Sequence, residues 1–156
     1  MSTVDAAPTP QSGSENERFA SRVMAMELEV EGHHPGYVRN FAQAWVKQKV
    51  PAHLDFVVTP RFFDLHPDAV QAVQNLSDNG VSIRALADDE YRRMERVSHL
   101  RYFHGWSLFC RYLELLNADH GLVMYYDFFQ LPAAVGRSCP CPYSAIYFRP
   151  TFHYHL

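Results

Sequence analysis

Short apolar runs alternate with segments of helical periodicity along most of this chain. Apolar residues at every second position predict strands, whereas apolar residues at i, i+3 and i+4 predict amphipathic helices. Strands that alternate with helices favour right-handed βαβ crossovers and a mostly parallel sheet. The pattern therefore predicts an α/β fold, with one Rossmann-like, three-layer domain. The expected strands are residues 23–30, 54–59, 81–86, 122–127 and 143–148, and the expected helices are residues 38–49, 67–79, 88–117 and 131–136.

The first expected strand has one clearly apolar face. Every second residue from Met24 to Val30 is apolar, whereas Glu27 and Glu29 belong to the other face. Carboxylates on that face favour a strand that is covered on one side only. We expect this strand to lie at the centre of the sheet. In the long helix, Gly105 costs about 1 kcal/mol relative to alanine, which makes it the expected place for a break.

Residues 1–18 are small and polar, and they show no apolar periodicity. Such a segment buries too little apolar surface to offset its ordering entropy, so we expect a disordered tail followed by one domain over residues 19–156. The tail lacks the basic stretch and apolar run of a secretory signal. It also contains acidic residues, whereas a transit peptide is rich in arginine and poor in acids. The expected location is therefore the cytoplasm.

Charge and cysteine content argue against several classes of protein. A net charge of -3 and a pI of about 6.3 do not suit a nucleic-acid binder that works by bulk charge. No apolar run approaches the roughly 18 residues of a transmembrane helix. The 3 cysteines are an odd set, too few for a secreted disulfide framework.

Most histidines and several carboxylates fall in loops that follow the expected strands, where open parallel sheets bind ligands. Glu31 and Asp127 end two of these strands, and a carboxylate there can orient a sugar hydroxyl or act as a base; the alternative is a turn acceptor or a helix cap. Residues 32–36 lead into a helix N-terminus that favours an anion, unless their glycines only serve a tight turn. Arg149 and His153 follow the fifth strand at the same edge.

Four residues near the end of the chain are of types that bind zinc: Cys139, Cys141, His153 and His155. Their spacing fits no common zinc module, and a rigid loop explains Cys-Pro-Cys-Pro more economically. We therefore expect neither a metal nor a cofactor. Cys110 lies on an apolar helix face and is expected in the core.

Two stretches carry a family resemblance. Residues 26–41 (MELEVEGHHPGYVRNF) resemble the first strand, loop and helix of GT-B-fold glycosyltransferases, and within these the retaining group 1 type of bacteria. Residues 143–154 (YSAIYFRPTFHY) look like the end of that family's N-terminal domain. The resemblance implies that the first loop lies in the interdomain cleft, near the donor phosphates and the acceptor. The candidate catalytic residues are Glu31, His34 and Asp127, and the candidate substrate-binding residues are Gly32, His33, Pro35, Gly36, Tyr37, Arg149 and His153.

Members of that family carry a second Rossmann-like domain, which grips the nucleotide-sugar with an acidic motif of two glutamates. No such domain appears before Leu156. The resemblance therefore implies the N-terminal, acceptor-side half of an enzyme that moves a sugar from a nucleotide-sugar to an acceptor hydroxyl. We expect this half to be inactive without a complementary donor-domain protein, and to self-associate through the face that such a domain would cover. The alternative is a non-catalytic Rossmann-like binding or partner module.

Overall fold

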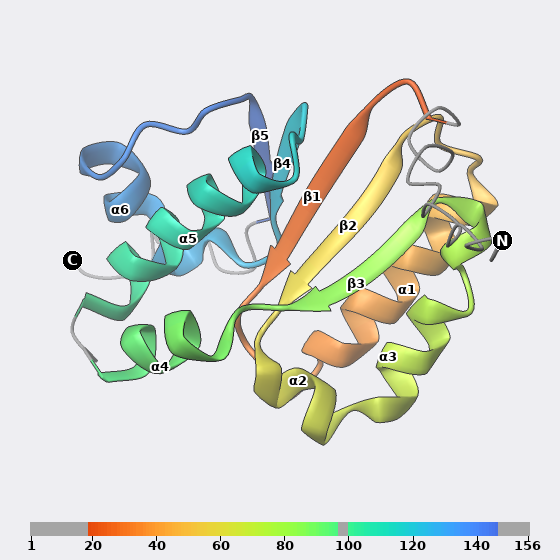
Figure 1. The fold of residues 1–156 in the computed structure, drawn as a ribbon, viewed down its shortest axis with the longest axis horizontal. Coiled ribbons are helices and arrows are strands. Elements are labelled where there is room, and N and C mark those ends of the chain that lie inside the picture. The colour runs from red at the N-terminus through yellow and green to blue at the C-terminus, as the bar shows by residue number, and fades with distance from the viewer. Residues whose placement is uncertain (1–18, 97–99, 147–156) are drawn as a thin grey trace, which may run out of the picture.

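All five expected strands are present and pair in parallel within one sheet, in the order β3-β2-β1-β4-β5 (Figure 1). This computed structural model describes residues 19–96 and 100–146. The α/β, Rossmann-like prediction and the central place of the first strand are confirmed, whereas the predicted disordered tail lies outside the described residues. The strands are β1 (Arg22–Glu27), β2 (His53–Val58), β3 (Val81–Ala85), β4 (His120–Val123) and β5 (Tyr143–Ala145).

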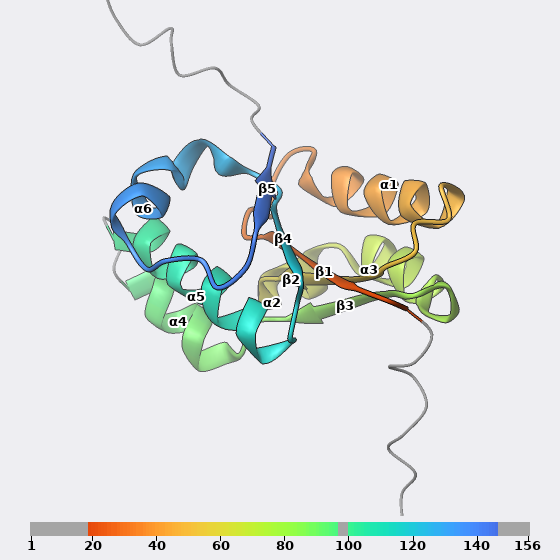
Figure 2. The ribbon, with the colours of Figure 1, turned by 90° about the horizontal axis from the view of Figure 1, so that it is seen from above.

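Helices cover both faces of the sheet (Figure 2). On one side lie α1 (His34–Lys47), α2 (Pro60–Leu65) and α3 (Pro67–Gln74), and on the other lie α4 (Asp88–Arg96), α5 (Arg101–Leu115) and α6 (Gln130–Val135). Two short 3-10 turns complete the described elements, η1 (Ser77–Asn79) and η3 (Tyr126–Phe128). No helix in the described ranges is long and apolar enough to cross a membrane.

The core consists of two apolar layers, one on each side of the sheet. Because side chains alternate along a strand, Ala25 of β1 packs toward α1 while Met24 and Met26 pack toward α5. The largest buried side chains of the α5 layer are Trp106 and Phe109. Their burial holds α5 against the centre of the sheet. The helices on this side are the third layer of the predicted architecture.

The expectation of a half-covered first strand is wrong. Glu27 is 1% exposed, because the two helical layers close over both faces of the central strand. Its carboxylate is buried with hydrogen-bond partners, as a buried charge requires. The strand also ends earlier than expected, at Glu27, although Leu28 and Val30 beyond it remain buried.

Several element boundaries also differ from expectation. Helix α1 begins at His34, four residues early, because Pro35 suits the first helical turn. The segment expected as a single helix over residues 88–117 is two helices, and Gly105 lies inside α5 rather than at the break. A Cβ at Gly105 would meet Leu28 Cδ1 at 2.8 Å, so glycine here permits close helix–strand packing. Helix α2 was not expected, and η3 replaces the end of the fourth strand.

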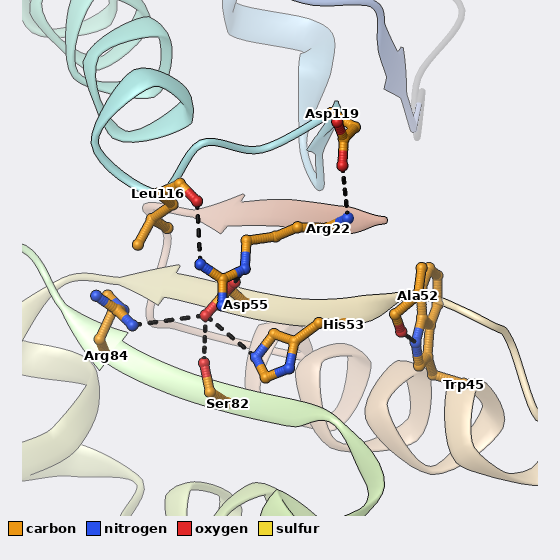
Figure 3. A network of polar contacts seen from close by, with 9 residues as sticks. All are labelled: Arg22, Trp45, Ala52, His53, Asp55, Ser82, Arg84, Leu116 and Asp119. Carbon is orange, nitrogen blue, oxygen red and sulfur yellow. Dashed lines mark hydrogen bonds and ion pairs between the residues drawn. The ribbon is translucent and has the colours of Figure 1, made fainter. Parts of the chain in front are cut away.

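A buried aspartate ties three strands together on the α5 side of the sheet (Figure 3). Asp55 of β2 is 1% exposed and accepts a hydrogen bond from Ser82 Oγ of β3 at 2.6 Å. Its carboxylate oxygens lie 3.2 Å from Arg22 Nε of β1 and 3.5 Å from both His53 Nε2 and Arg84 Nη2. Ser82 is the register partner of Asp55 on β3, and Arg22 and Arg84 lie two positions from its register partners, so these contacts stabilise the parallel register.

The surroundings of Asp55 also set its titration. Burial acts to raise the pKa of this carboxyl, but hydrogen bonds from His53 and Ser82 and the charges of His53 and Arg22 leave the pKa below its ordinary value of 3.8. A lowered native-state pKa means that the carboxylate stabilises the fold above the unfolded-state pKa, and that this stabilisation is lost as the pH falls through the native value.

Replacing Asp55 with asparagine should therefore lower the free energy of unfolding at pH 7 by about 1–3 kcal/mol, the usual cost of a buried group left without its partner. The difference from wild type should narrow as the pH drops below about 3.8, where the wild-type carboxylate also gains a proton. Urea unfolding between pH 3 and pH 7 measures both effects. Asp64→Asn, at an exposed aspartate of α2, is the matched control. A constant difference at every pH would contradict this account of Asp55.

Candidate functional site

The loop between β1 and α1 lies at the carboxyl edge of the sheet, where ligands of open parallel sheets bind. The sequence predicted this loop at this edge, and its placement is confirmed. Because β1 is the central strand, the loop has neighbours from both sides. The segment after β4, including η3, follows from the same edge and brings Tyr125 against His34, with ring centroids 5.3 Å apart.

A buried carboxylate–imidazole pair stands at the centre of this edge. Nδ1 of His34 lies 2.9 Å from Oε2 of Glu27, and the two side chains are 10% and 1% exposed. Oε1 of the same carboxylate accepts the backbone N–H of Glu29 at 2.9 Å. A carboxylate can only accept, so Nδ1 is the donor. In the neutral imidazole this leaves Nε2 with a free lone pair, directed away from Glu27.

Aromatic rings enclose His34. The ring of His33 stacks on it with centroids 5.0 Å apart, and Tyr125 and Tyr37 approach edge-on at 5.3 and 6.4 Å. His33 itself is exposed, whereas Tyr37 and Tyr125 are partly buried. The rings fix the orientation of the imidazole and reduce its contact with water, which strengthens its interaction with Glu27.

The pair shifts the titration of His34. The hydrogen bond to Glu27 raises the pKa of the imidazole above 6.5; burial opposes this, and the charges of Glu27 and Glu29 add to the increase. A histidine in this setting accepts a proton more readily than a free imidazole. The arrangement can hold a hydroxyl through Nε2 and take its proton, with Glu27 stabilising the resulting imidazolium.

Three contacts from other elements hold the loop in place. Nε2 of His66 donates to the Val30 carbonyl at 2.6 Å, from the junction of α2 and α3. Arg101 of α5 pairs with Glu29 at 3.5 Å, and Arg61 of α2 pairs with Glu31 at 3.6 Å. Gly32 has a φ of 68°, a left-handed conformation that glycine adopts without strain. The loop is therefore fixed by both flanking helical layers.

The predicted catalytic residues fall in different settings. His34 is buried in the pair, but its carboxylate partner is Glu27, not Glu31. The Glu31 side chain is 81% exposed and faces Arg61. Asp127 lies in η3, one turn after β4, and its backbone carbonyl accepts Gln130 Nε2 at 3.4 Å. The catalytic roles of these residues stay predictions.

The predicted substrate-binding residues cluster in the first loop and in the first turn of α1. Gly32 and Gly36 have open space around them, since a Cβ at either would meet no atom within 4 Å. The rings of His33 and Tyr37 are in contact, with centroids 4.6 Å apart, and Pro35 lies in the first turn of α1. Arg149 and His153 lie outside the described residues.

Glu27 is the residue that sequence reasoning missed. Its place in an alternating strand indicated a partly covered surface, and that interpretation concealed a buried acid. The available indication was its position: a carboxylate at the last residue of a central parallel strand, followed by two histidines within one loop. A buried acid of this kind needs a hydrogen-bond donor, and His34 is within reach.

Within the described residues, no three His, Cys, Asp or Glu side chains are arranged to hold a metal ion. The sequence matches no protein-family model and no curated protein sequence.

The pair predicts a characteristic dependence of stability on pH. Because the native-state pKa of His34 is raised, its stabilising effect is complete below the unfolded value of 6.5 and is lost as the pH rises through the native value. Glu27→Gln should abolish this loss and destabilise the domain by about 1–3 kcal/mol below pH 6.5. Urea unfolding from pH 6 to pH 9, with NMR titration of the imidazole, measures both.

Glu31→Gln is the matched control, since it removes a carboxylate only four residues away that is largely exposed. It should leave both the stability and the pH dependence as in wild type. Equal behaviour of the two variants would show that the Glu27–His34 contact does not set the titration of His34.

Proposed function

We propose that this domain forms the acceptor side of a glycosyltransferase, which moves a sugar from a nucleotide-sugar donor to an acceptor hydroxyl. The observation that carries the proposal is the Glu27–His34 pair, at 2.9 Å, in the loop where the family resemblance implies the interdomain cleft. The all-parallel sheet, with this loop after its central strand, agrees with the fold that the resemblance implies.

Glycosyl transfer makes two demands that this edge can meet. A reacting hydroxyl must be held and must lose its proton, and Nε2 of His34 is the acceptor available for it. The leaving diphosphate needs positive potential, and the N-terminal end of α1, whose first residue is His34, supplies part of it. We assign hydroxyl binding and proton acceptance to His34, and we retain Asp127 and Glu31 as further candidates for orienting sugar hydroxyls.

Transfer also needs a donor domain to enclose the diphosphate and exclude water. We propose that such a domain packs against the carboxyl edge, as a separate protein or as another part of the same enzyme. A cytoplasmic location is part of the proposal, and an odd set of 3 cysteines suits a reducing compartment better than a secreted disulfide framework. The competing function is a non-catalytic binding module that uses the same edge.

The test combines the domain with a donor domain of the same family and a panel of nucleotide-sugars. Isothermal titration calorimetry should detect weak or no binding to the domain alone, and sugar transfer should appear only in the mixture. His34→Asn should reduce the transfer rate by at least tenfold, because its amide N–H can replace the Nδ1 donor to Glu27 but nothing replaces the basic Nε2. Asp64→Asn, at an exposed carboxylate of α2 that has no assigned role in the site, is the comparison variant.

Strong transfer by the domain alone would contradict the need for a second domain. Transfer that is unchanged in His34→Asn would remove His34 from the reaction. Specific binding of a ligand without any transfer, in the mixture as well, would favour the binding module.

A substitution at Gly36 can distinguish an effect on transfer from an effect on stability. Its Cβ position is open and its φ is not positive, so Gly36→Ala should keep or raise the free energy of unfolding, by up to about 1 kcal/mol for a helical residue. The added methyl group would still occupy space beside the loop that a ligand uses. We expect lower transfer with undiminished stability, measured by urea unfolding and steady-state kinetics. Transfer at the wild-type rate would show that the ligand does not approach Gly36.

A further inference from the structure

Three thiols converge far from the candidate site. Cys110 of α5 is buried in the apolar layer, and Cys139 and Cys141 pack against that layer from the segment between α6 and β5. Cys139 lies near enough to both Cys110 and Cys141 that its thiol contributes to raising the pKa of each. Sequence reasoning explained these cysteines separately, as a core residue and a rigid loop. Together they form a cluster, which we call the thiol cluster.

The segment that carries Cys139 is fixed on α5. Trp106 Nε1 donates to the Arg137 carbonyl at 2.7 Å, and Cys110 Sγ lies 3.9 Å from the same oxygen. The Arg137 guanidinium pairs with Glu114 of α5. At the far end, Gly121 N–H of β4 donates to the Pro142 carbonyl at 2.9 Å. Both ends of the segment 137–142 are thus anchored by hydrogen bonds, which keeps Cys139 beside the helix that carries Cys110.

We propose that Cys110 and Cys139 form a reversible disulfide, with Cys139 as the thiol that meets the oxidant. With hydrogen peroxide, the Cys139 thiolate attacks one oxygen, the O–O bond breaks, and hydroxide leaves to become water. Cys110 then attacks the sulfenic sulfur of Cys139 and gives its proton to the departing hydroxyl, so that an S–S bond forms, the S–O bond breaks, and a second water leaves. Two thiols are oxidised by two electrons, and one peroxide is reduced to two waters.

The order of events follows from the surroundings of each thiol. Burial first, and then the neighbouring Cys139, raise the pKa of Cys110 to about 12, so this thiol keeps its proton at neutral pH and does not react first. Cys139 is partly exposed, which admits an oxidant. Cys141 is separated from Cys139 by Pro140 alone, and the fixed φ of proline restricts the turn that a disulfide between such close residues requires.

A Cys110–Cys139 disulfide would join the middle of α5 to the segment that precedes β5. It would restrain the unfolded chain between the two residues, so the oxidised protein should have a higher Tm than the reduced protein. The thiol cluster lies before the start of β5, at the amino edge of the sheet, opposite the Glu27–His34 pair. Its oxidation therefore adjusts stability without blocking the candidate site.

The test treats the full-length protein with limited hydrogen peroxide, alkylates the remaining thiols, and digests with trypsin. Cleavage after Arg101, Arg111 and Arg137 places Cys110 on the peptide 102–111 and both other cysteines on the peptide 138–156. We expect a cross-link between these two peptides, a higher Tm by calorimetry, and reversal of both by dithiothreitol. The cross-link should persist in Cys141→Ser and disappear in Cys139→Ser.

Cys110→Ala tests the buried partner without adding a polar group to the core, and it should also lose the cross-link and the rise in Tm. Circular dichroism shows whether each variant is folded before oxidation. The proposal is overturned by an intact set of thiols after oxidation, by a disulfide confined to the peptide 138–156, or by a cross-link that survives in folded Cys139→Ser.

Discussion

Burial of the central strand β1 from Met24 to Glu27 is the constraint on which the fold and the candidate site both depend. Apolar side chains from β1 enter the layers on both sides, so helices must close over both faces. That closure leaves Glu27, at the last position of the strand, without water. A buried carboxylate requires donors, and the chain supplies them from the next residues, Glu29 N–H and His34 Nδ1. The site is thus a consequence of how the central strand ends.

The two buried carboxylates of the sheet show why only one of them suits chemistry. Asp55 is held by two arginines, a serine and a histidine, and the arginines stay charged at every pH in which the domain folds. That network stabilises the strand register, and the charge of its arginines does not change with pH. Among the residues that the structure describes, His34 is the ionisable side chain that hydrogen-bonds to Glu27. An imidazole gains and loses its proton near neutral pH. The pair can therefore move a proton.

The sequence predicted the sheet well because each strand carried its own local pattern. All five strands and the parallel topology followed from apolar runs separated by helical segments and turns. Boundaries were less predictable, since they depend on neighbours distant in the chain. Leu28 sits beyond the end of β1 but is buried under Gly105 of α5, and no local pattern contains that contact. From its sequence neighbours alone, Gly105 indicated a helix break. In the structure it lies inside α5, and its missing side chain leaves room for Leu28.

The candidate site divides in the same way between local and distant determinants. The loop, its glycines and His34 were predicted, because the alternation of strand and helix is enough to place a loop at the carboxyl edge. The identity of the carboxylate was not predicted, because Glu27 was expected on the uncovered face of the first strand, whereas Glu31 was expected at the end of that strand. Tertiary structure distinguishes them: Glu27 is buried against His34 of α1, whereas the Glu31 side chain is 81% exposed beside Arg61 of α2. The titrating pair forms at Glu27 because the helices that cover the sheet keep water from this carboxylate, so that it needs a hydrogen-bond donor from the protein.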